Sequence, residues 1–394
     1  MRAKPTMNEV ATEAGVSLGT VSKVLNGNST VAAELRARVL AACERLNYQR
    51  NRIAASLRSR QTNTIGVIVP DILNTFYAAL VEKLENLASA AGYTLMVVTT
   101  GEDPWRARER IGVLKERQVD GMIVIPSFDG SELLAPAIGA DMPCVIADRI
   151  SAKDAYPSVA TDNFDAAYQG AKYLLSLGHR HITLAVNTRR LWNSEERIAG
   201  FERALVERKG KADVRIVGMT VEEACISIEG LCRERARPTA LFASNNLVTL
   251  GALRALQNCR VDVPGEMSFL AFDDFEWLSL LQPAVSAIRQ PVDQIAVEAW
   301  RLMLHEIGGQ SISTPHIRAS GELIVRGSTA IERGLAQSAA ARGRSCFDAG
   351  DPAHMRPHRR HVRGPRHGRT HGGESDAGAH LAARDATRID GGLK

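Results

Sequence analysis

The sequence predicts a small all-α domain at the N-terminus, an α/β region with parallel sheets, and a C-terminal tail without regular structure. Three observations support this order. The 394 residues exceed the roughly 250–300 at which single hydrophobic cores usually stop growing, so more than one folding unit is expected. Two short amphipathic helix patterns open the chain, and β-rich runs then alternate with helix-length segments. Residues from about 334 onward show neither pattern.

The first helix is expected to begin at Met7. Thr6 and Glu9 have the spacing of a capping box, in which the hydroxyl of Thr6 accepts from the Glu9 amide and the Glu9 carboxylate reaches back. An apolar stripe follows on the helix, made by Val10, Ala11 and Ala14. Gly15 then supplies a turn that needs a positive φ angle.

Two further helices complete the head. The second should start at Ser17, a good N-cap, and run to about Leu25. The third should run from about Ala32 to Leu46 and close a small core through Val39, Leu40, Cys43 and Leu46. Two short helices joined by a tight glycine turn form a helix-turn-helix unit, which places its second helix in the major groove of DNA.

The second helix offers two kinds of DNA contact. Leu18, Gly19 and Lys23 should point away from the core, where they can face base edges. Hydroxyl groups suited to phosphate oxygens come from Ser17, Thr20 and Ser22. The alternative is an inert solvated face.

The distribution of charge supports a DNA partner for the head. Residues 1–60 carry ten lysines and arginines against four glutamates, whereas residues 61–333 carry more acidic than basic side chains. A basic head on an acidic body suggests that only the head faces a polyanion.

The central region contains β-rich runs that alternate with amphipathic segments, which predicts parallel sheets covered by helices on both faces. The runs are numerous enough for two sheets, and include 65–69, 95–99, 122–125, 145–147, 182–186, 241–243 and 269–272. Ligands of such sheets bind beyond the carboxyl ends of the strands.

The tail is rich in alanine, glycine, arginine and histidine, so we expect a disordered basic segment. His354, His358 and His361 have a spacing that could suggest a metal site, but we expect no metal there. The six cysteines contain no C-x-x-C pair and are expected to be reduced and structural. No apolar stretch is long enough for a membrane helix and residues 1–30 lack a secretory signal, which favours a cytoplasmic protein with no membrane partner.

Several separated motifs resemble the lactose-repressor (LacI/GalR) family of bacterial transcriptional regulators. They occur in the family's order at 10–17, 20–26 and 51–57, and the likeness continues to about Ser328. The family usually has arginine where this chain has Lys23, which would weaken bidentate guanine recognition and keep the charge. The resemblance implies a DNA-contacting set of Thr6, Ser17, Leu18, Gly19, Thr20, Ser22, Lys23, Asn26, Asn51, Arg52, Ala54 and Leu57.

Arg50–Leu57 is too short and too poorly capped for a stable isolated helix. The resemblance implies that two such hinge segments pair on DNA, become helical, and insert Leu57 into the minor groove, where an apolar wedge can kink a base step. A plain interdomain linker is the alternative. One helix-turn-helix reads little DNA, so a homodimer on a palindromic operator is expected, and a higher oligomer is open.

The resemblance also implies three parts: 1–60 for DNA binding with the hinge, 61–333 for effector binding and dimerisation, and 334–394 as the tail. The middle part would be periplasmic-binding-protein-like, with two doubly wound subdomains at 62–161 plus 292–321 and 162–291 plus 322–331. An effector would bind in the cleft between them.

A polyol effector needs a fork of donors and an ionised acceptor, which Arg197 and Asp273 supply. Phe76, Phe164 or Trp192 could stack on a sugar ring. The complete predicted ligand set is Asn74, Phe76, Asp148, Phe164, Trp192, Arg197, Asn245, Asp273 and Gln290, although each could instead have a structural role.

The charge of the effector is a separate question. The family usually reads Asn-Asp where this chain has Asn245-Asn246, and the extra cations Arg189 and Arg190 follow a predicted strand. Together they favour an anionic effector such as a sugar acid.

Two other functions are less well supported. No nucleophile elbow, phosphate-binding loop, dinucleotide fingerprint or H-E-x-x-H motif is present, so neither an enzyme nor a cofactor is expected. A transport-type binding protein would share the middle domain but would need a signal peptide and lack the head. We therefore expect a transcriptional regulator, a repressor controlled by a sugar or sugar acid.

Overall fold

The computed structural model describes residues 5–25, 30–48, 61–127, 134–150, 155–309 and 315–332. The predicted hinge, Arg50–Leu57, and the predicted tail, 334–394 with its three spaced histidines, lie outside the described residues.

The head contains three helices: α1 (Met7–Ala14), α2 (Leu18–Leu25) and α3 (Ala33–Arg45). The predicted capping box is confirmed, because the amide of Thr6 donates to Glu9 Oε2 (2.6 Å) and the amide of Glu9 donates to Thr6 Oγ1 (3.4 Å). Gly15 ends α1 with φ 59°. Arg38 Nη2 donates to the carbonyl of Ala14 (2.7 Å), which ties α3 to this turn.

The core of the head is formed by Val10, Ala11 and Ala14 of α1, Val21 and Val24 of α2, and Val39 and Ala42 of α3. The prediction that Leu40 closes this core is wrong, since its side chain is 48% exposed. A helix advances about 100° per residue, so Val39 and Ala42 share a face that excludes Leu40.

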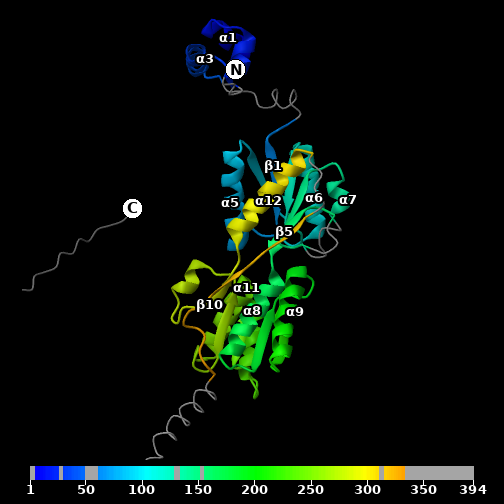
Figure 1. The fold of residues 1–394 in the computed structure, drawn as a ribbon, viewed down its shortest axis with the longest axis vertical. Helices are drawn as coiled ribbons and strands as arrows, with labels where there is room; N and C mark the ends of the chain where they lie inside the picture. The colour runs from blue at the N-terminus through cyan, green and yellow to red at the C-terminus, as the bar shows by residue number, and fades with distance from the viewer. Residues whose placement is uncertain are drawn as a thin grey trace, which may run out of the picture. The chain divides into compact units, whose positions relative to one another are not determined.

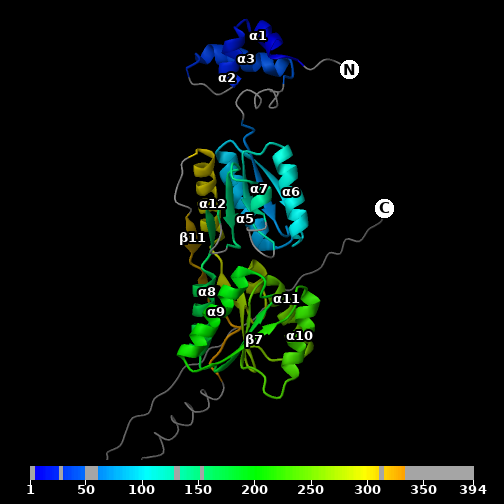
Figure 2. The same cartoon turned by 90° about the vertical axis from the view of Figure 1, so that its right-hand side faces the viewer.

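The first sheet has the strand order β11-β5-β4-β3-β1-β2, and all its pairs are parallel. Its strands are β1 (Thr64–Val69), β2 (Thr94–Thr99), β3 (Gly121–Val124), β4 (Cys144–Ala147), β5 (Ser158–Thr161) and β11 (His316–Ala319). The helices are α5 (Thr75–Ala90) and α12 (Val292–Ile307) on one face, and α6 (Pro104–Glu116) and α7 (Ala135–Ile138) on the other, as Figure 1 and Figure 2 show.

The second sheet has the order β12-β10-β9-β8-β6-β7. Its strands are β6 (His181–Val186), β7 (Lys211–Ile216), β8 (Ala240–Ala243), β9 (Ser268–Phe272), β10 (Ser286–Arg289) and β12 (Glu322–Ile324). Its helices are α8 (Asn163–Ser176) and α9 (Trp192–Glu207) on one face, and α10 (Val221–Arg233) and α11 (Asn246–Asn258) on the other, with a short 3-10 helix η2 (Glu276–Ser279).

These elements confirm the predicted fold class, an all-α head with two α/β subdomains. The prediction that the sheets are parallel is wrong at one edge of the second sheet, because β12 is antiparallel to β10. The chain enters β12 directly from β11 of the other sheet, without the crossover helix that would bring it back in a parallel direction.

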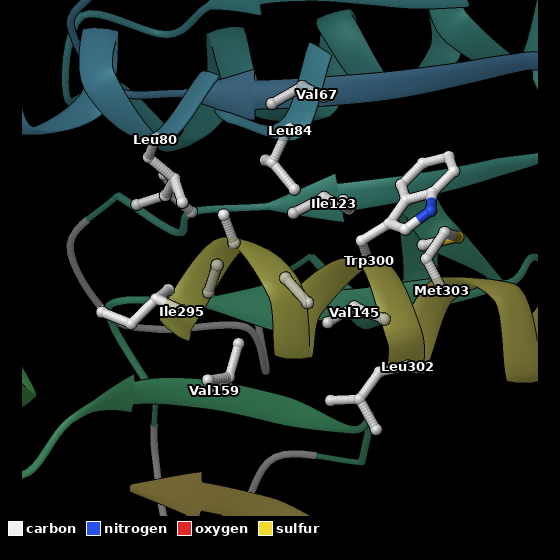
Figure 3. Packing of buried hydrophobic residues seen from close by; sticks show 14 of the residues in the cluster. Val67, Leu80, Leu84, Ile123, Val145, Val159, Ile295, Trp300, Leu302 and Met303 are labelled. Atoms are coloured by element: carbon white, nitrogen blue, oxygen red, sulfur yellow. The ribbon is translucent and has the colours of Figure 1, made fainter. Parts of the chain in front are cut away.

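Both faces of the first sheet carry a hydrophobic core, because successive side chains of a strand point to opposite faces. Figure 3 shows Val67 and Ile123 of the sheet packed with Leu84 of α5 and Trp300 of α12. The rings of Trp300 and Tyr93 meet edge to face with centroids 5.6 Å apart. Full burial of an aliphatic side chain such as Val67, Ile123 or Leu84 contributes about 1.5–3 kcal/mol.

The chain passes between the two sheets three times, after β5, after β10 and after β11. These passages are hydrogen-bonded to one another. The amide of Asp162 donates to the carbonyl of Ala319 (2.8 Å), and Thr161 Oγ1 donates to Gln290 Oε1 (2.6 Å). The three passages therefore form one connected hinge beside the carboxyl ends of the strands.

Candidate DNA interface and ligand cleft

Helix α2 presents one exposed face in the head. Leu18 is 47% exposed, and Gly19 and Lys23 are also exposed, whereas Val21 and Val24 are buried. This arrangement puts an apolar and a cationic side chain on the surface that a major groove would meet.

Two of the predicted hydroxyl groups, from Ser17 and Thr20, lie at the start of the same helix. Ser17 Oγ accepts from the amide of Thr20 (3.1 Å) and lies 2.9 Å from Thr20 Oγ1. Thr6 is exposed as the N-cap of α1, and Ser22 is half-buried on α2. The other predicted DNA contacts lie outside the described residues: Asn26, Asn51, Arg52, Ala54 and Leu57.

A cleft with a volume of about 390 Å³ lies between the two α/β subdomains, at the carboxyl ends of their strands. Seven of the nine predicted ligand residues line it: Asn74, Phe76, Asp148, Arg197, Asn245, Asp273 and Gln290. The fold brings together residues that are up to about two hundred positions apart in the sequence, because the carboxyl ends of parallel strands lie at the same edge of a sheet.

Two predicted aromatic residues do not line the cleft. Phe164 is 40% exposed and stacks on Tyr168 of the same helix with centroids 6.4 Å apart. Trp192 is 41% exposed at the first position of α9. The side of this helix that faces the cleft carries Asn193, Ser194 and Arg197. Successive residues of a helix are about 100° apart, so the side chain of Trp192 lies outside that side.

Arg197 is a buried guanidinium group whose position is fixed by three contacts. Nε donates to Asn163 Oδ1 (2.8 Å), and Nη1 donates to the carbonyl oxygen of Ser244. The guanidinium carbon lies 3.6 Å from the centroid of the Phe272 ring. Burial lowers the pKa of Arg197, and the nearby carboxylates oppose this effect.

Asp273 follows β9 and has a left-handed backbone, with φ 76°. Its Oδ1 accepts from Gln290 Nε2, and its Oδ2 accepts from the amide of Asn246 (3.2 Å). Burial raises the pKa of Asp273, while Arg197 and the two donors act against that shift.

Asp148 follows β4 and also has a left-handed backbone, with φ 62°. Tyr77 donates its hydroxyl to Asp148 Oδ2 (3.1 Å). The other oxygen of this carboxylate, Asp148 Oδ1, is buried and has no hydrogen-bond partner among the described residues. Burial raises the pKa of Asp148, and Arg149 and Arg197 partly offset this. An unpaired buried carboxylate oxygen is costly, so this atom is suited to accept from a ligand.

Asn74 and Asn245 have the structural role that the sequence left open. Asn74 Oδ1 caps α5 by accepting from the amide of Phe76 (3.1 Å), and Asn245 Oδ1 caps α11 by accepting from the amide of Val248 (2.9 Å). Across the cleft, Asn246 Nδ2 donates to Asn74 Oδ1 (3.3 Å). The two helix starts are therefore hydrogen-bonded to each other across the subdomain boundary.

Further cleft residues were not identified individually from the sequence. Arg149 forms a two-pronged ion pair with Glu102, both nitrogen-oxygen distances being 2.6 Å. Tyr77, Asn187, Asn193 and Ser194 also line the cavity. Glu102 could have been found from its place just after β2, and Asn193 and Ser194 from their helical spacing to Arg197.

Within the described residues, no helix is long and apolar enough to cross a membrane.

Known proteins share both parts of this architecture. Residues 6–51 match the family model for bacterial regulatory proteins of the lacI family, and residues 171–329 match a periplasmic binding protein-like domain. The HTH-type transcriptional regulator PtxS of Pseudomonas plecoglossicida is 32% identical over 334 residues, which cover 84% of this chain and 97% of that protein.

Solved structures agree with this assignment. The lac repressor dimer bound to operator and an anti-inducer shares the fold, with a TM-score of 0.75 at 24% identity over 83% of this chain and all of that chain. The transcriptional regulator CelR in complex with cellobiose has a TM-score of 0.61 at 25% identity, covering 82% of this chain and all of that one. The matched relatives are regulators rather than enzymes, and this chain belongs to the lacI family of bacterial regulatory proteins, as a DNA-binding regulator of transcription.

Proposed function

We propose that this protein is a repressor that binds a palindromic operator as a homodimer, and that a sugar or sugar acid bound in the cleft controls its affinity for DNA. The effector class rests on one observation. One cavity is faced by Arg197 and Asp273 of the second subdomain and by Asp148 of the first, and together they offer a guanidinium donor and carboxylate acceptors to the hydroxyl groups of a sugar.

Coupling between effector and DNA follows from the two-part architecture. The cleft is lined by both subdomains, so a ligand that contacts both favours one arrangement of the hinge. It can change operator affinity only by its difference in affinity for the two arrangements. CelR is seen in complex with cellobiose, which supports a sugar as the class of effector.

A homodimer is supported by the size of the head. A single helix-turn-helix contacts one half-site, and a two-fold symmetric pair reads two half-sites about one helical turn apart. Each protomer would place Leu18, Gly19 and Lys23 in a major groove.

The experiment is a selection of random duplex DNA by the full-length protein, followed by measurement of mass and of operator affinity with and without candidate sugars. We expect a palindromic consensus, a dimeric mass in the complex, and a change in affinity with at least one sugar. A non-palindromic consensus bound by one protomer would contradict the dimer, and unchanged affinity with every sugar would contradict the effector class.

A further inference from the structure

The charges that line the cleft are not balanced. Four carboxylates face it, from Asp71, Glu102, Asp148 and Asp273, against two guanidinium groups, from Arg149 and Arg197. Three of the carboxylates belong to the first subdomain and one to the second, so the negative charge surrounds the cavity. The inference below rests on the proposed function, because it concerns the chemical class of the cleft's effector.

Both arginines of the cleft are already engaged by partners within the protein. Both Nη atoms of Arg149 are bound to Glu102, and Nη1 also donates to the carbonyl of Pro126 (3.1 Å). This ion pair is neutral as a unit, and its two-pronged geometry is of the strong kind.

Arg197 is committed in part and is flanked by opposite charge. Its Nε and Nη1 are bound to Asn163 and Ser244. The carboxylates of Asp148, in the first subdomain, and Asp273, in the second, both raise the pKa of Arg197 and so favour its charged form. With both carboxylates ionised, the unit formed by one guanidinium and two carboxylates has a net negative charge, to which Asp71 at the exposed rim adds.

Three buried atoms of the lining have no hydrogen-bond partner among the described residues, and two of them, Asp148 Oδ1 and Asn193 Oδ1, are acceptors on side chains more than nine-tenths buried. The third is the donor Arg149 Nε, which lies 4.0 Å from Asp148 Oδ2. A ligand must bring donors to the two acceptors, and an ammonium group brings three donors together with a compensating charge.

The cations that favoured a sugar acid do not reach this cavity. Arg189 pairs with Glu195 (3.3 Å), and neither Arg189 nor Arg190 is among the residues that line the cleft. Asn246, which stands where the family usually has an aspartate, donates a hydrogen bond to Asn74 across the cleft.

We propose that the cleft is built for a polyol that bears an amine, such as an amino sugar, and that it discriminates against sugar acids and sugar phosphates. Arg197 and Gln290 hold the hydroxyl groups. Asp148, with its open oxygen, and the surplus carboxylates receive the ammonium group. Two unit charges a few ångströms apart in a partly buried site interact strongly enough to change affinity by about tenfold or more.

The test compares sugars of one ring configuration that are neutral, carry an ammonium group at C2, or carry a carboxylate at C6. Full-length protein is titrated calorimetrically with glucose, glucosamine and glucuronate, and with the corresponding galacto and manno sets. Within the configuration that binds best, we expect the amine to bind about tenfold tighter than the neutral sugar and the acid to bind more weakly than both.

A variant at the rim isolates the charge. Asp71→Asn keeps the hydrogen bond that Asp71 Oδ1 accepts from the amide of Leu73 (2.9 Å) and removes one negative charge. We expect it to reduce the preference for the amine over the neutral sugar by about threefold at low salt. Glu202→Gln, which removes the same charge from the exposed side of α9, should leave that preference unchanged.

The outcomes separate this inference from the proposed function. A neutral sugar or a sugar acid that binds at least as tightly as its amine overturns the amine preference, and the sugar-controlled repressor stands. Binding by none of the sugars overturns both. An equal effect of Asp71→Asn and Glu202→Gln would show that general surface charge, rather than the cleft, sets the preference.

Discussion

Gln290 joins Asp273 to Thr161 by using both ends of its side-chain amide. Its Nε2 donates to Asp273 Oδ1, and its Oε1 accepts from Thr161 Oγ1 (2.6 Å). Thr161 and Gln290 lie at two of the passages between the sheets, so a carboxylate of the cleft is hydrogen-bonded to the hinge. A ligand that moves Asp273 therefore acts on the hinge through a single side chain.

Gln290→Glu should destabilise the protein, because it places a second carboxylate against Asp273. We expect a loss of about 1–3 kcal/mol in the free energy of unfolding at neutral pH, measured with urea. The loss should shrink below about pH 5, since two adjacent carboxylates share a proton. Thr161→Val, which leaves Asp273 paired, should cost less and show no such pH dependence. Equal losses of unfolding free energy for both variants across the pH range would show that the hydrogen bond from Gln290 to Asp273 does not stabilise the protein.

Arg197→Ala should abolish the response to effector and leave operator binding without effector nearly unchanged. Removal of a buried donor fork should lower ligand affinity about a hundredfold or more. Operator affinity is measured by anisotropy with and without the sugar that binds best. Arg203→Ala, on the exposed side of the same helix, is the control and should respond like the native protein. A normal response in Arg197→Ala would place the effector outside this cleft.

Lys23→Ala should weaken operator binding and reduce its dependence on salt. A lysine that contacts a phosphate contributes about one unit to the slope of log affinity against log salt. Arg235→Ala removes an exposed cation from the second subdomain and should leave both quantities unchanged. An unaltered slope in Lys23→Ala, with weaker binding to one base pair only, would identify Lys23 as a base reader instead.

His179 should make the second subdomain sensitive to acid. It is buried, with Nδ1 2.9 Å from Thr239 Oγ1 and Nε2 3.0 Å from the carbonyl oxygen of Ala330. Burial lowers the pKa of His179, so the unfolded chain binds a proton at a pH where the folded protein does not. Its contribution to stability should be complete above about pH 6.5 and lost as the pH falls below that value.

His179→Gln should flatten this acid dependence relative to the native protein, since it removes the titrating group. Melting temperatures between about pH 8 and pH 5 measure the difference. His181, whose pKa burial also lowers, remains in both proteins and cancels in the comparison. Parallel curves for the two proteins would show that His179 does not cause the loss.

The sequence predicted best those elements whose pattern is local. The capping box at Thr6 and the apolar strands β1, β4 and β9 each carry their signal within a few residues. Strand β7 mixes lysine, aspartate and arginine at an exposed edge, so no apolar run marks it. The antiparallel edge β12 is only three residues long.

The cleft residues that could be predicted from the sequence are those that belong to a family motif or directly follow a strand. Asp148 and Asp273 both follow strands, and the resemblance supplied Arg197 on its helix. The pairing of Arg149 with Glu102 depends on how two loops approach in space, which residue spacing does not reveal. Phe164 and Trp192 have aromatic rings suited to stacking on a sugar, but residue type does not determine the direction of a side chain on a helix.

The threefold passage of the chain between the sheets has a consequence for synthesis on the ribosome. The first sheet lacks its edge strand β11 until residue 319 has emerged, by which time all the strands of the second sheet except β12 have been made. Helix α12, which covers one face of the first sheet, also arrives after most of the second subdomain. Synthesis therefore cannot finish the first subdomain before starting the second, and one face of the first sheet stays without helix α12 until residue 307 has been made.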